Sequence, residues 1–221
     1  MKRTRLQKAL ATALAVTTVV GMTMTAGATG TAPAASSTGS AAAAAQQVVE
    51  AAGQTAAPTT STVTVAGQKI VTTIAGAYLA KTVDGLAVMT AADSIKGAYG
   101  LSASQSLYIM VMDTDPARSY NAMASLNAAA AALNATMGPV LNINLGFKEN
   151  GKYTTLPEGD GEIMMTVAIP AEFQDAAATY AVVVVRTGGV ITVLPDLDGN
   201  VETVTFNTKG GLGSCYALVK Y

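Results

Sequence analysis

Two apolar runs flank the glycine pair Gly188–Gly189 in the stretch 179–194. Val, Ile, Thr and Tyr dominate both runs, and these residues suit a pleated, half-buried strand. A Gly–Gly pair supplies the positive φ angles that a tight hairpin needs. In residues 180–185 both alternating sets of side chains are apolar, which is typical of a strand covered on both faces. The pattern therefore predicts a β-hairpin in the interior of a covered sheet.

Other segments carry strand patterns too. Residues 107–112 are apolar on both faces and predict a second interior strand. In 140–147 apolar residues alternate with Asn142 and Asn144, which predicts a strand with the two asparagines on a solvated face. Residues 162–169 alternate as well, with apolar side chains inward. The remaining predicted strands are 63–65, 70–74, 77–82 paired with 86–90 around Asp84–Gly85, 153–156 after an Asn150–Gly151 turn, 201–207 and 214–221.

One long Ala-rich helix is predicted over residues 116–137. Asp115 is a good N-cap, Pro116 suits the first helical position, and Gly138–Pro139 would end the helix. A stripe at helical spacing can pack on a sheet, and its members are Tyr120, Met123, Asn127, Ala130, Leu133 and Met137.

A short helix is predicted at 91–98, with Thr90 and Asp93 as a capping box and Gly100 at its end. Regularly spaced strands with one long helix predict an α+β fold. We expect a mostly antiparallel β-sheet or β-sandwich, with the helix at about 116–137 covering one face.

The N-terminal segment predicts export. Four basic residues precede an apolar run at 9–20, and Ala26-Gly27-Ala28 offers small residues for cleavage. We therefore assign 1–28 to a signal peptide, with an uncleaved N-terminal anchor as the alternative. Residues 29–61 are rich in Ala, Thr, Ser and Gly and predict a flexible linker. Residues 62–221 are expected to form a single folded β-rich domain.

Charge and composition exclude several chemistries. The chain has 13 basic and 14 acidic residues. Loss of the four basic residues of the signal peptide leaves 9 basic and 14 acidic residues, a net charge of −5, which argues against a nucleic-acid partner. The chain has no histidine, so Ser-His-Asp and Cys-His catalysis and His-ligated zinc are ruled out. With Cys215 as the only cysteine, no intramolecular disulfide can form.

The C-terminal half resembles a known kind of module. Its motifs are IMMTVAIPAEF, then TYAVVVVRTGGVITVLPDLDGNVETVTFNT, then SCYALVKY. In this order they resemble the β-rich C-terminal module of secreted and cell-surface proteins of clostridial-type Gram-positive bacteria. The resemblance covers about 106–221 well and 62–100 loosely. It implies a β-rich fold and an extracellular setting, and it implies no activity, because such modules serve mostly as spacers or accessory units.

The sequence departs from that pattern at two points. Arg186-Thr187-Gly188 stands where such modules often carry a histidine-containing turn. The chain also lacks a C-terminal LPxTG motif with a hydrophobic tail, so covalent attachment to a cell wall is not supported.

Two acidic groups are candidate sites. Asp196-Leu197-Asp198-Gly199-Asn200 resembles the start of a calcium loop, but Asn207 stands where the bidentate Glu of such a loop belongs. The competing interpretation is a turn built from Asp, Gly and Asn, and we favour it. Asp113 and Asp115 could form a catalytic or cation-binding pair, although Asp115 is better explained as a helix cap.

The other candidates are weaker. Cys215 could be a nucleophile only with Lys or a carboxylate as its base, and a small buried hydrophobe is the better interpretation. The glycine-rich run 210–213 precedes a strand and so does not suit a phosphate loop. Exposed tyrosines could stack on sugars, but we expect the eight tyrosines to lie mostly in the core and at its rim.

These observations predict a secreted, extracellular, non-enzymatic module with a structural or interaction role. We expect no catalytic residue, no metal and no cofactor. The expected partner is an extracellular protein or glycan, without nucleic acid, and without a membrane after signal cleavage. One alternative is a glycan- or peptide-binding accessory protein that uses exposed Tyr and Asn side chains such as Asn142 and Asn144. A distant alternative is a histidine-free hydrolase with two carboxylates facing one cleft.

Overall fold

The computed structural model describes residues 61–65, 67–211 and 214–221. They form a β-rich α+β domain with 45% strand and two helices, in which the sheets are mostly antiparallel and one is mixed. The predicted fold class is confirmed at this level. The predicted signal peptide 1–28 and almost all of the predicted linker 29–61 lie outside the described residues, so the division of the chain stays a prediction.

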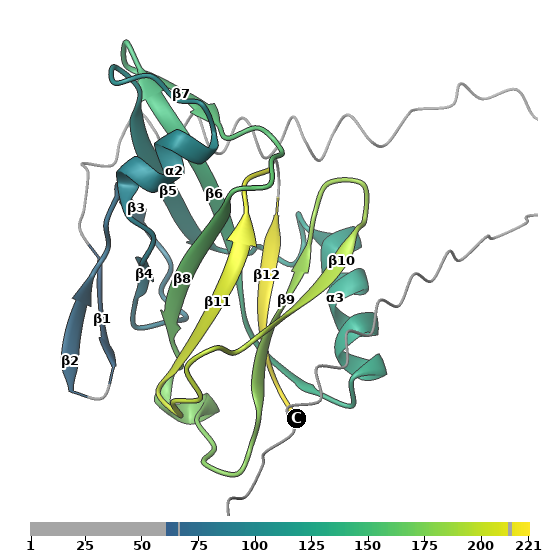
Figure 1. The fold of residues 1–221 in the computed structure, drawn as a ribbon. Helices are drawn as coiled ribbons and strands as arrows, with labels where there is room; N and C mark the ends of the chain where they lie inside the picture. The colour runs from purple at the N-terminus through teal and green to yellow at the C-terminus, as the bar shows by residue number, and fades with distance from the viewer. Residues whose placement is uncertain (1–60, 66, 212–213) are drawn as a thin grey trace, which may run out of the picture. The chain divides into compact units, whose positions relative to one another are not determined.

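Seven strands form the large sheet (Figure 1). Its order is β10 (Ile191–Pro195), β9 (Tyr180–Val185), β12 (Cys215–Lys220), β6 (Thr136–Glu149), β5 (Ser106–Asp113) and β3 (Ala75–Tyr78). β7 (Lys152–Thr155) pairs with the far end of β6. All neighbours are antiparallel except β3 and β5, which run parallel. The sequence order jumps several times along the sheet, so most of its pairs join segments that are distant in the chain.

A second, smaller sheet has the order β11 (Thr203–Lys209), β8 (Glu162–Ala168) and β4 (Leu86–Val88). A separate hairpin is formed by β1 (Thr62–Val65) and β2 (Gln68–Val71). The helical elements are α2 (Ala92–Ala98), α3 (Tyr120–Ala132) and a 3-10 turn at Ala171–Phe173. In Figure 1, β8 and β11 lie on one side of the large sheet, and α3 lies next to β9 and β10.

One apolar core joins the two sheets. Alternate residues of each strand face it, as the period of two in a strand requires. The large sheet contributes Leu107, Ile109, Val111, Leu141, Ile143, Leu145, Val182, Val184 and Leu218, and the small sheet contributes Leu86, Val88, Ile163, Met165, Val167, Val204 and Phe206. The two sheets therefore bury their apolar faces against each other.

The opposite face of the large sheet is covered by α3. Leu126 and Ala130 of the helix are buried against a second cluster on β9 and β12, which consists of Ala181, Val183, Val185, Cys215, Ala217 and Val219. Small side chains on both sides let the helix and the sheet approach closely. Cover on both faces explains why every residue of β9 is buried, as the sequence predicted for 180–185.

The long helix is shorter than predicted. It spans 13 residues, Tyr120–Ala132, and not 116–137. Residues 116–118 form a turn in which the Asp115 carbonyl accepts from the Ser119 N–H. The helix ends where Asn134 takes a positive φ of 52°, which a helix C-terminus accommodates at Asn. The predicted stop at Gly138–Pro139 lies inside β6, beside an irregularity in its pairing with β12, where a proline is tolerated.

The predicted hairpin around Asp84–Gly85 is wrong. β3 joins the large sheet next to β5, whereas β4 joins the small sheet next to β8. The connection therefore crosses from one sheet to the other. The capping box is wrong as well, since the N-terminus of α2 has no side-chain cap and the Thr90 hydroxyl accepts from the Met164 N–H instead.

The hairpin at 180–195 forms, but only half of it lies in the interior. β9 is central, whereas β10 is the edge strand of the large sheet and, among the described strands, pairs with β9 alone. Four of its five residues are exposed. The apolar pattern of 191–194 resembles that of an interior strand. β10 lies at the edge because of the strand order, which the local pattern does not encode.

Candidate functional site

The predicted calcium loop is a cap on the edge of β11. Asp196 Oδ1 accepts from the N–H of Thr205 at 2.9 Å, and the Thr205 carbonyl accepts from the N–H of Leu197 at 2.8 Å. Asp198 Oδ2 accepts from the hydroxyls of Thr203 and Thr205 at 3.0 and 2.6 Å. The loop thus bonds to the strand that would otherwise expose its polar edge.

The same loop is also held along its own length. Asp196, Asp198 and Asn200 each accept a hydrogen bond from the N–H two residues later. Burial raises the pKa of Asp196, against the opposite effect of the hydrogen bonds from Thr205 and Asp198. Within the described part of the chain, no three Cys, Asp or Glu side chains gather closely enough to hold a metal ion. The arrangement supports a structural turn over a calcium site.

Asp113 and Asp115 serve different segments. Asp113 accepts from the N–H groups of Lys81 and Thr82 and from the Thr82 hydroxyl, so it fixes the connection between the two sheets. Burial alone would raise the pKa of Asp113, but these hydrogen bonds outweigh it and lower the pKa. Asp115 accepts from the Ala117 N–H and lies 3.4 Å from Arg118. The two carboxylates thus have separate hydrogen-bond and ion-pair partners and do not act as a pair.

Cys215 is a buried side chain beneath α3. Its Sγ donates to Asn142 Oδ1 at 3.1 Å, across the pair of strands that places the two residues opposite each other. Burial raises the pKa of the thiol, which keeps it protonated and a poor nucleophile. The predicted interpretation as a small buried hydrophobe fits this environment.

The asparagines do not form a solvated face. Asn142 is half-buried, and Asn144 is only 8% exposed. The prediction of a solvated face on β6 is wrong, because α3 covers the face at one end and Tyr153 folds over Gly146 at the other. The polar residues that suggested glycan binding are therefore not available at the surface.

Most tyrosines are structural, as predicted. Tyr108, Tyr180 and Tyr216 are buried, and only Tyr120 and Tyr221 are largely exposed. Tyr108 packs edge-on against Tyr153, with the Lys148 ammonium 3.5 Å above its ring. Burial raises the pKa of Tyr153 and of Tyr216. The tyrosines thus form no exposed aromatic platform for a sugar.

The glycine-rich run meets a polar cluster. The Gly210 N–H donates to Tyr99 Oη at 2.6 Å, and a Cβ at Gly210 would lie 2.8 Å from the Tyr99 ring. Arg186 donates to the carbonyls of Lys209 and Gly210 and to the Thr208 hydroxyl. Gly210 is thus required by close packing, and Arg186 ties the β9–β10 hairpin to the end of β11. Residues 212–213 of the run lie outside the described residues.

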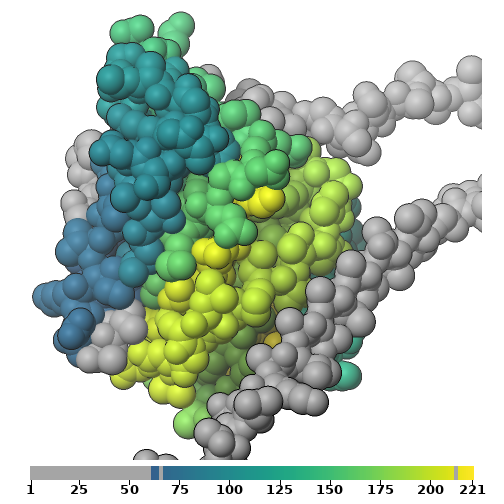
Figure 2. Space-filling model, in the orientation of Figure 1, coloured from purple at the N-terminus to yellow at the C-terminus, as the bar shows by residue number. Residues whose placement is uncertain are grey.

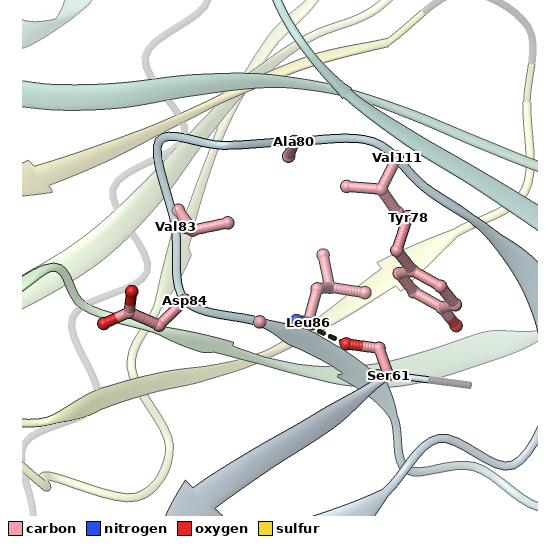
Figure 3. A pocket seen from close by; sticks show the side chains of 8 residues that line it. Ser61, Tyr78, Ala80, Val83, Asp84, Leu86 and Val111 are labelled. Atoms are coloured by element: carbon pink, nitrogen blue, oxygen red, sulfur yellow. Dashed lines mark hydrogen bonds between the residues drawn. The ribbon is translucent and has the colours of Figure 1, made fainter. Parts of the chain in front are cut away.

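A small pocket lies where the chain crosses between the sheets. Its volume is about 240 Å³, below the roughly 300–1,000 Å³ of ligand pockets. It is lined by Ser61, Tyr78, Ala80, Val83, Asp84, Gly85, Leu86 and Val111. Figure 3 shows Asp84 pointing away from Tyr78 and Val111, and the Ser61 hydroxyl engaged by the Leu86 N–H. The Ser61 hydroxyl of the pocket is thus used by the fold, and Asp84 is the one charged residue in the lining.

The feature that stands out is the free edge of β10, which sequence reasoning missed. The Arg186 N–H donates to the Val190 carbonyl, so residues 190, 192 and 194 face β9 by the alternation of an antiparallel pair. Thr179 and Tyr221 exchange two backbone hydrogen bonds, so residues 181, 183 and 185 of β9 bond to β12 by the same alternation. This leaves residues 182 and 184 of β9 to bond to β10, in agreement with the Arg186 bond. Ile191 and Val193 therefore direct their N–H and C=O groups outward from the sheet.

The side chains at this edge are apolar and exposed. The exposed fractions of Val190, Ile191 and Val193 are 58%, 43% and 41%. Ile191 and Val193 share the face of the sheet that α3 covers over β9. In Figure 2, residues of the C-terminal third, in lime and yellow, spread over the surface of the face that is shown. We call the outward backbone and side chains of 190–193 the β10 edge.

Natural edge strands are usually protected by charged residues, bulges, prolines or a covering loop. The β10 edge has no charged residue from 187 to 195, and its pairing with β9 is regular. Of these devices, the sequence of the strand itself supplies Pro195, which removes the outward N–H at the end of the strand. The β11 edge, by contrast, is capped by the Asp196–Asn200 loop. This uncharged run is the signal in the sequence that could have identified the edge.

No helix in the described ranges is both long and apolar enough to cross a bilayer. Comparisons with protein-family models, with curated proteins and with solved structures give no significant match to this chain. The resemblance to the clostridial-type surface modules therefore stays a prediction.

Proposed function

We propose that this chain is a secreted, non-enzymatic extracellular module that binds another polypeptide by strand addition at the β10 edge. In strand addition, an extended segment joins a sheet, main-chain hydrogen bonds supply affinity, and alternate side chains supply specificity. The observation that carries the proposal is the contrast between the two neighbouring edges. A dedicated loop caps β11, whereas the described residues make no backbone hydrogen bond to the outward N–H and C=O groups of Ile191 and Val193.

The non-enzymatic part of the proposal rests on the state of the candidate groups. Asp113, Asp196 and Asp198 each accept hydrogen bonds that hold loops in place. Cys215 is buried and protonated beside an amide. A hydrolase without histidine would need two carboxylates facing one cleft, and the pocket at the crossing between the sheets is lined by the single carboxylate of Asp84, whose side chain points away from Tyr78 and Val111.

The peptide-binding alternative fits the same edge, whereas the glycan-binding alternative loses its support. Asn144 is buried and Asn142 bonds to Cys215. The exposed tyrosines are far apart in the chain, with Tyr120 at the start of α3 and Tyr221 at position 221. These Asn and Tyr side chains therefore do not form a shared surface on which a sugar could bind. Secretion is proposed from the residues of 1–28, and N-terminal sequencing of the protein recovered outside the cell tests it.

Val193→Pro tests strand addition at the edge. Proline removes only the outward N–H of residue 193, because this residue does not bond to β9, and edge positions tolerate proline. The wild-type chain and this variant are immobilised and exposed to the extracellular fraction of cells that secrete the protein. We expect a polypeptide that the wild-type chain retains and the variant loses, with hydrogen-exchange protection of Ile191 and Val193 in the complex.

Thr192→Pro is the matched comparison, since it removes an N–H that bonds to β9 and should lower stability rather than block the edge selectively. Equal retention of the same polypeptides by the wild-type chain and Val193→Pro would overturn the edge as the binding surface. Catalytic turnover by the purified chain would contradict the non-enzymatic part.

A further inference from the structure

We infer that the strand that occupies the β10 edge is β10 of a second copy of this chain, in an antiparallel pair centred on Thr192. This inference rests on the proposed function, because it names the partner of the same edge. It is carried by the symmetry of the edge itself. The two outward residues, Ile191 and Val193, lie one on each side of Thr192.

The hydrogen-bond pattern closes on itself in this register. Ile191 of one copy lies opposite Val193 of the other, and both residues present an outward N–H and C=O. An antiparallel pair of this kind exchanges two hydrogen bonds, and the two-fold axis repeats the pair. All outward groups of Ile191 and Val193 are thus satisfied in both copies. A register shifted by two residues toward Pro195 would place Pro195 opposite Ile191 and lose a donor, because proline has no N–H. The opposite shift would place Val193 opposite Gly189, whose N–H already donates to the Arg186 carbonyl.

The side chains agree with this register. Ile191 and Val193 lie on the same face of the sheet, so the pairing sets the Ile191 of each copy beside the Val193 of the other. Part of the apolar surface that each copy exposes, at residues that are 43% and 41% exposed, is then covered by the counterpart side chain. Thr192 meets its own copy on the other face, and Thr–Thr pairs across strands are favourable.

Charge does not oppose the pairing of two copies. The run 187–195 is uncharged, so no like charges face each other within the paired strands. A closed two-fold dimer is also the commonest symmetric assembly of soluble proteins, and it uses the same patch on both copies.

Disulfide trapping of the full chain tests both the partner and the register. In the predicted register, Thr192 and its copy form a non-hydrogen-bonded pair with Cα atoms about 4.5 Å apart. A disulfide needs roughly 4.4–6.8 Å between Cα atoms. Thr192→Cys should therefore give a covalent dimer on mild oxidation, whereas the wild-type chain, whose single cysteine is buried, should not.

Val190→Cys is the matched control on the same strand. It is exposed, but in this register it lies four residues away from its own copy, or about 13 Å along the strand. We expect no cross-link from Val190→Cys, a dimer mass for the wild-type chain by light scattering, and a monomer mass for both Val193→Pro and Val193→Lys. Near-native circular dichroism and cooperative unfolding show that each variant is folded.

Equal cross-linking of Thr192→Cys and Val190→Cys would overturn the register. A wild-type chain that stays monomeric at all concentrations, with no cross-link from Thr192→Cys, would overturn the second copy as the partner. In that case, edge-dependent capture of a different polypeptide, lost in Val193→Pro, would leave the proposed function standing. Absence of both dimer and capture would remove the two proposals together.

Discussion

At the scale of single residues, close contacts explain several glycines. Gly146 of β6 lies opposite Tyr108 of β5. A Cβ at Gly146 would lie 2.3 Å from the Thr154 carbonyl oxygen and 2.5 Å from the Tyr153 ring. Because Gly146 has no side chain, Tyr153 can fold over the strand and pack against Tyr108. The absence of a side chain at Gly146 thus leaves room for the aromatic contact between Tyr153 and Tyr108.

Gly146→Ala should therefore destabilise the fold. The added methyl group would meet backbone, which cannot move aside, and overpacking of this kind costs about 1–3 kcal/mol. Urea denaturation of the variant measures the free energy of unfolding. The control is Gly97→Ala in α2, where no atom lies within 4 Å of the added Cβ and a gain of about 0.5–1 kcal/mol is expected. Equal effects at the two positions would contradict the close contact at Gly146.

Asp198→Ala tests the loop that caps β11. The substitution removes the acceptor for the hydroxyls of Thr203 and Thr205, which are 0% and 8% exposed. The Thr205 hydroxyl keeps its hydrogen bond with the Thr166 hydroxyl, so the Thr203 hydroxyl is the group left without an acceptor. An unsatisfied buried hydroxyl costs about 1–3 kcal/mol, so the free energy of unfolding should fall by this amount. Glu202→Ala removes an exposed carboxylate from the turn that follows the loop and is the control for charge. A loss of stability that Glu202→Ala reproduces would point to charge and not to the hydrogen bonds.

Tyr78 gives a prediction for alkaline pH. Burial raises the pKa of Tyr78 from 10.0 to about 12, against the lowering effect of its hydrogen bond to Thr72. Since the folded-state pKa lies above the unfolded value, the contribution to stability is complete below pH 10 and is lost as pH rises toward 12. Tyr78→Phe should flatten the fall of the unfolding free energy in this window. Tyr120→Phe, at an exposed position, is the control, and an equal effect of both would contradict the assignment.

At the scale of elements, α3 shows what local patterns predict and what they miss. The helix and its cover of a sheet follow from the alanine-rich run, and its length does not. The helix ends just before Asn134, which is a weaker helix-stop signal than Gly138–Pro139. The proline instead lies in β6, where the pairing with β12 is irregular. The stripe that packs on the sheet also differs from the predicted one, since Leu126 is buried whereas Tyr120 is 75% exposed.

Leu126→Ala should be the most damaging single truncation in α3. Leu126 is fully buried against β9 and β12, and a Leu→Ala change at such a site costs about 2–5 kcal/mol. The neighbouring Asn127→Ala, at an exposed position of the same helix, should change stability by no more than about 0.5 kcal/mol. Chemical denaturation measures the free energy of unfolding of both variants. A small effect of Leu126→Ala would show that α3 does not cover the sheet.

At the scale of the whole molecule, the strand order determines which elements are interior. Residues 180–185 and 191–194 carry similar apolar patterns, yet β9 is fully buried and β10 is an exposed edge. The partition of β3 and β4 between two sheets is equally invisible to local signals, because it depends on pairing with β5 and β8. Sequence reasoning could therefore find the strands and the class of fold, but not the free edge that carries the proposed function.

Amide hydrogen exchange along β10, followed by nuclear magnetic resonance over a dilution series of the wild-type chain, tests the central claim most directly. The N–H groups of Thr192 and Leu194 bond to β9 and should exchange slowly at every concentration. Those of Ile191 and Val193 should exchange fast in dilute solution and become protected as the concentration rises and the β10 edge is occupied. Fast exchange of Ile191 and Val193 at every concentration and with every partner offered would contradict the account.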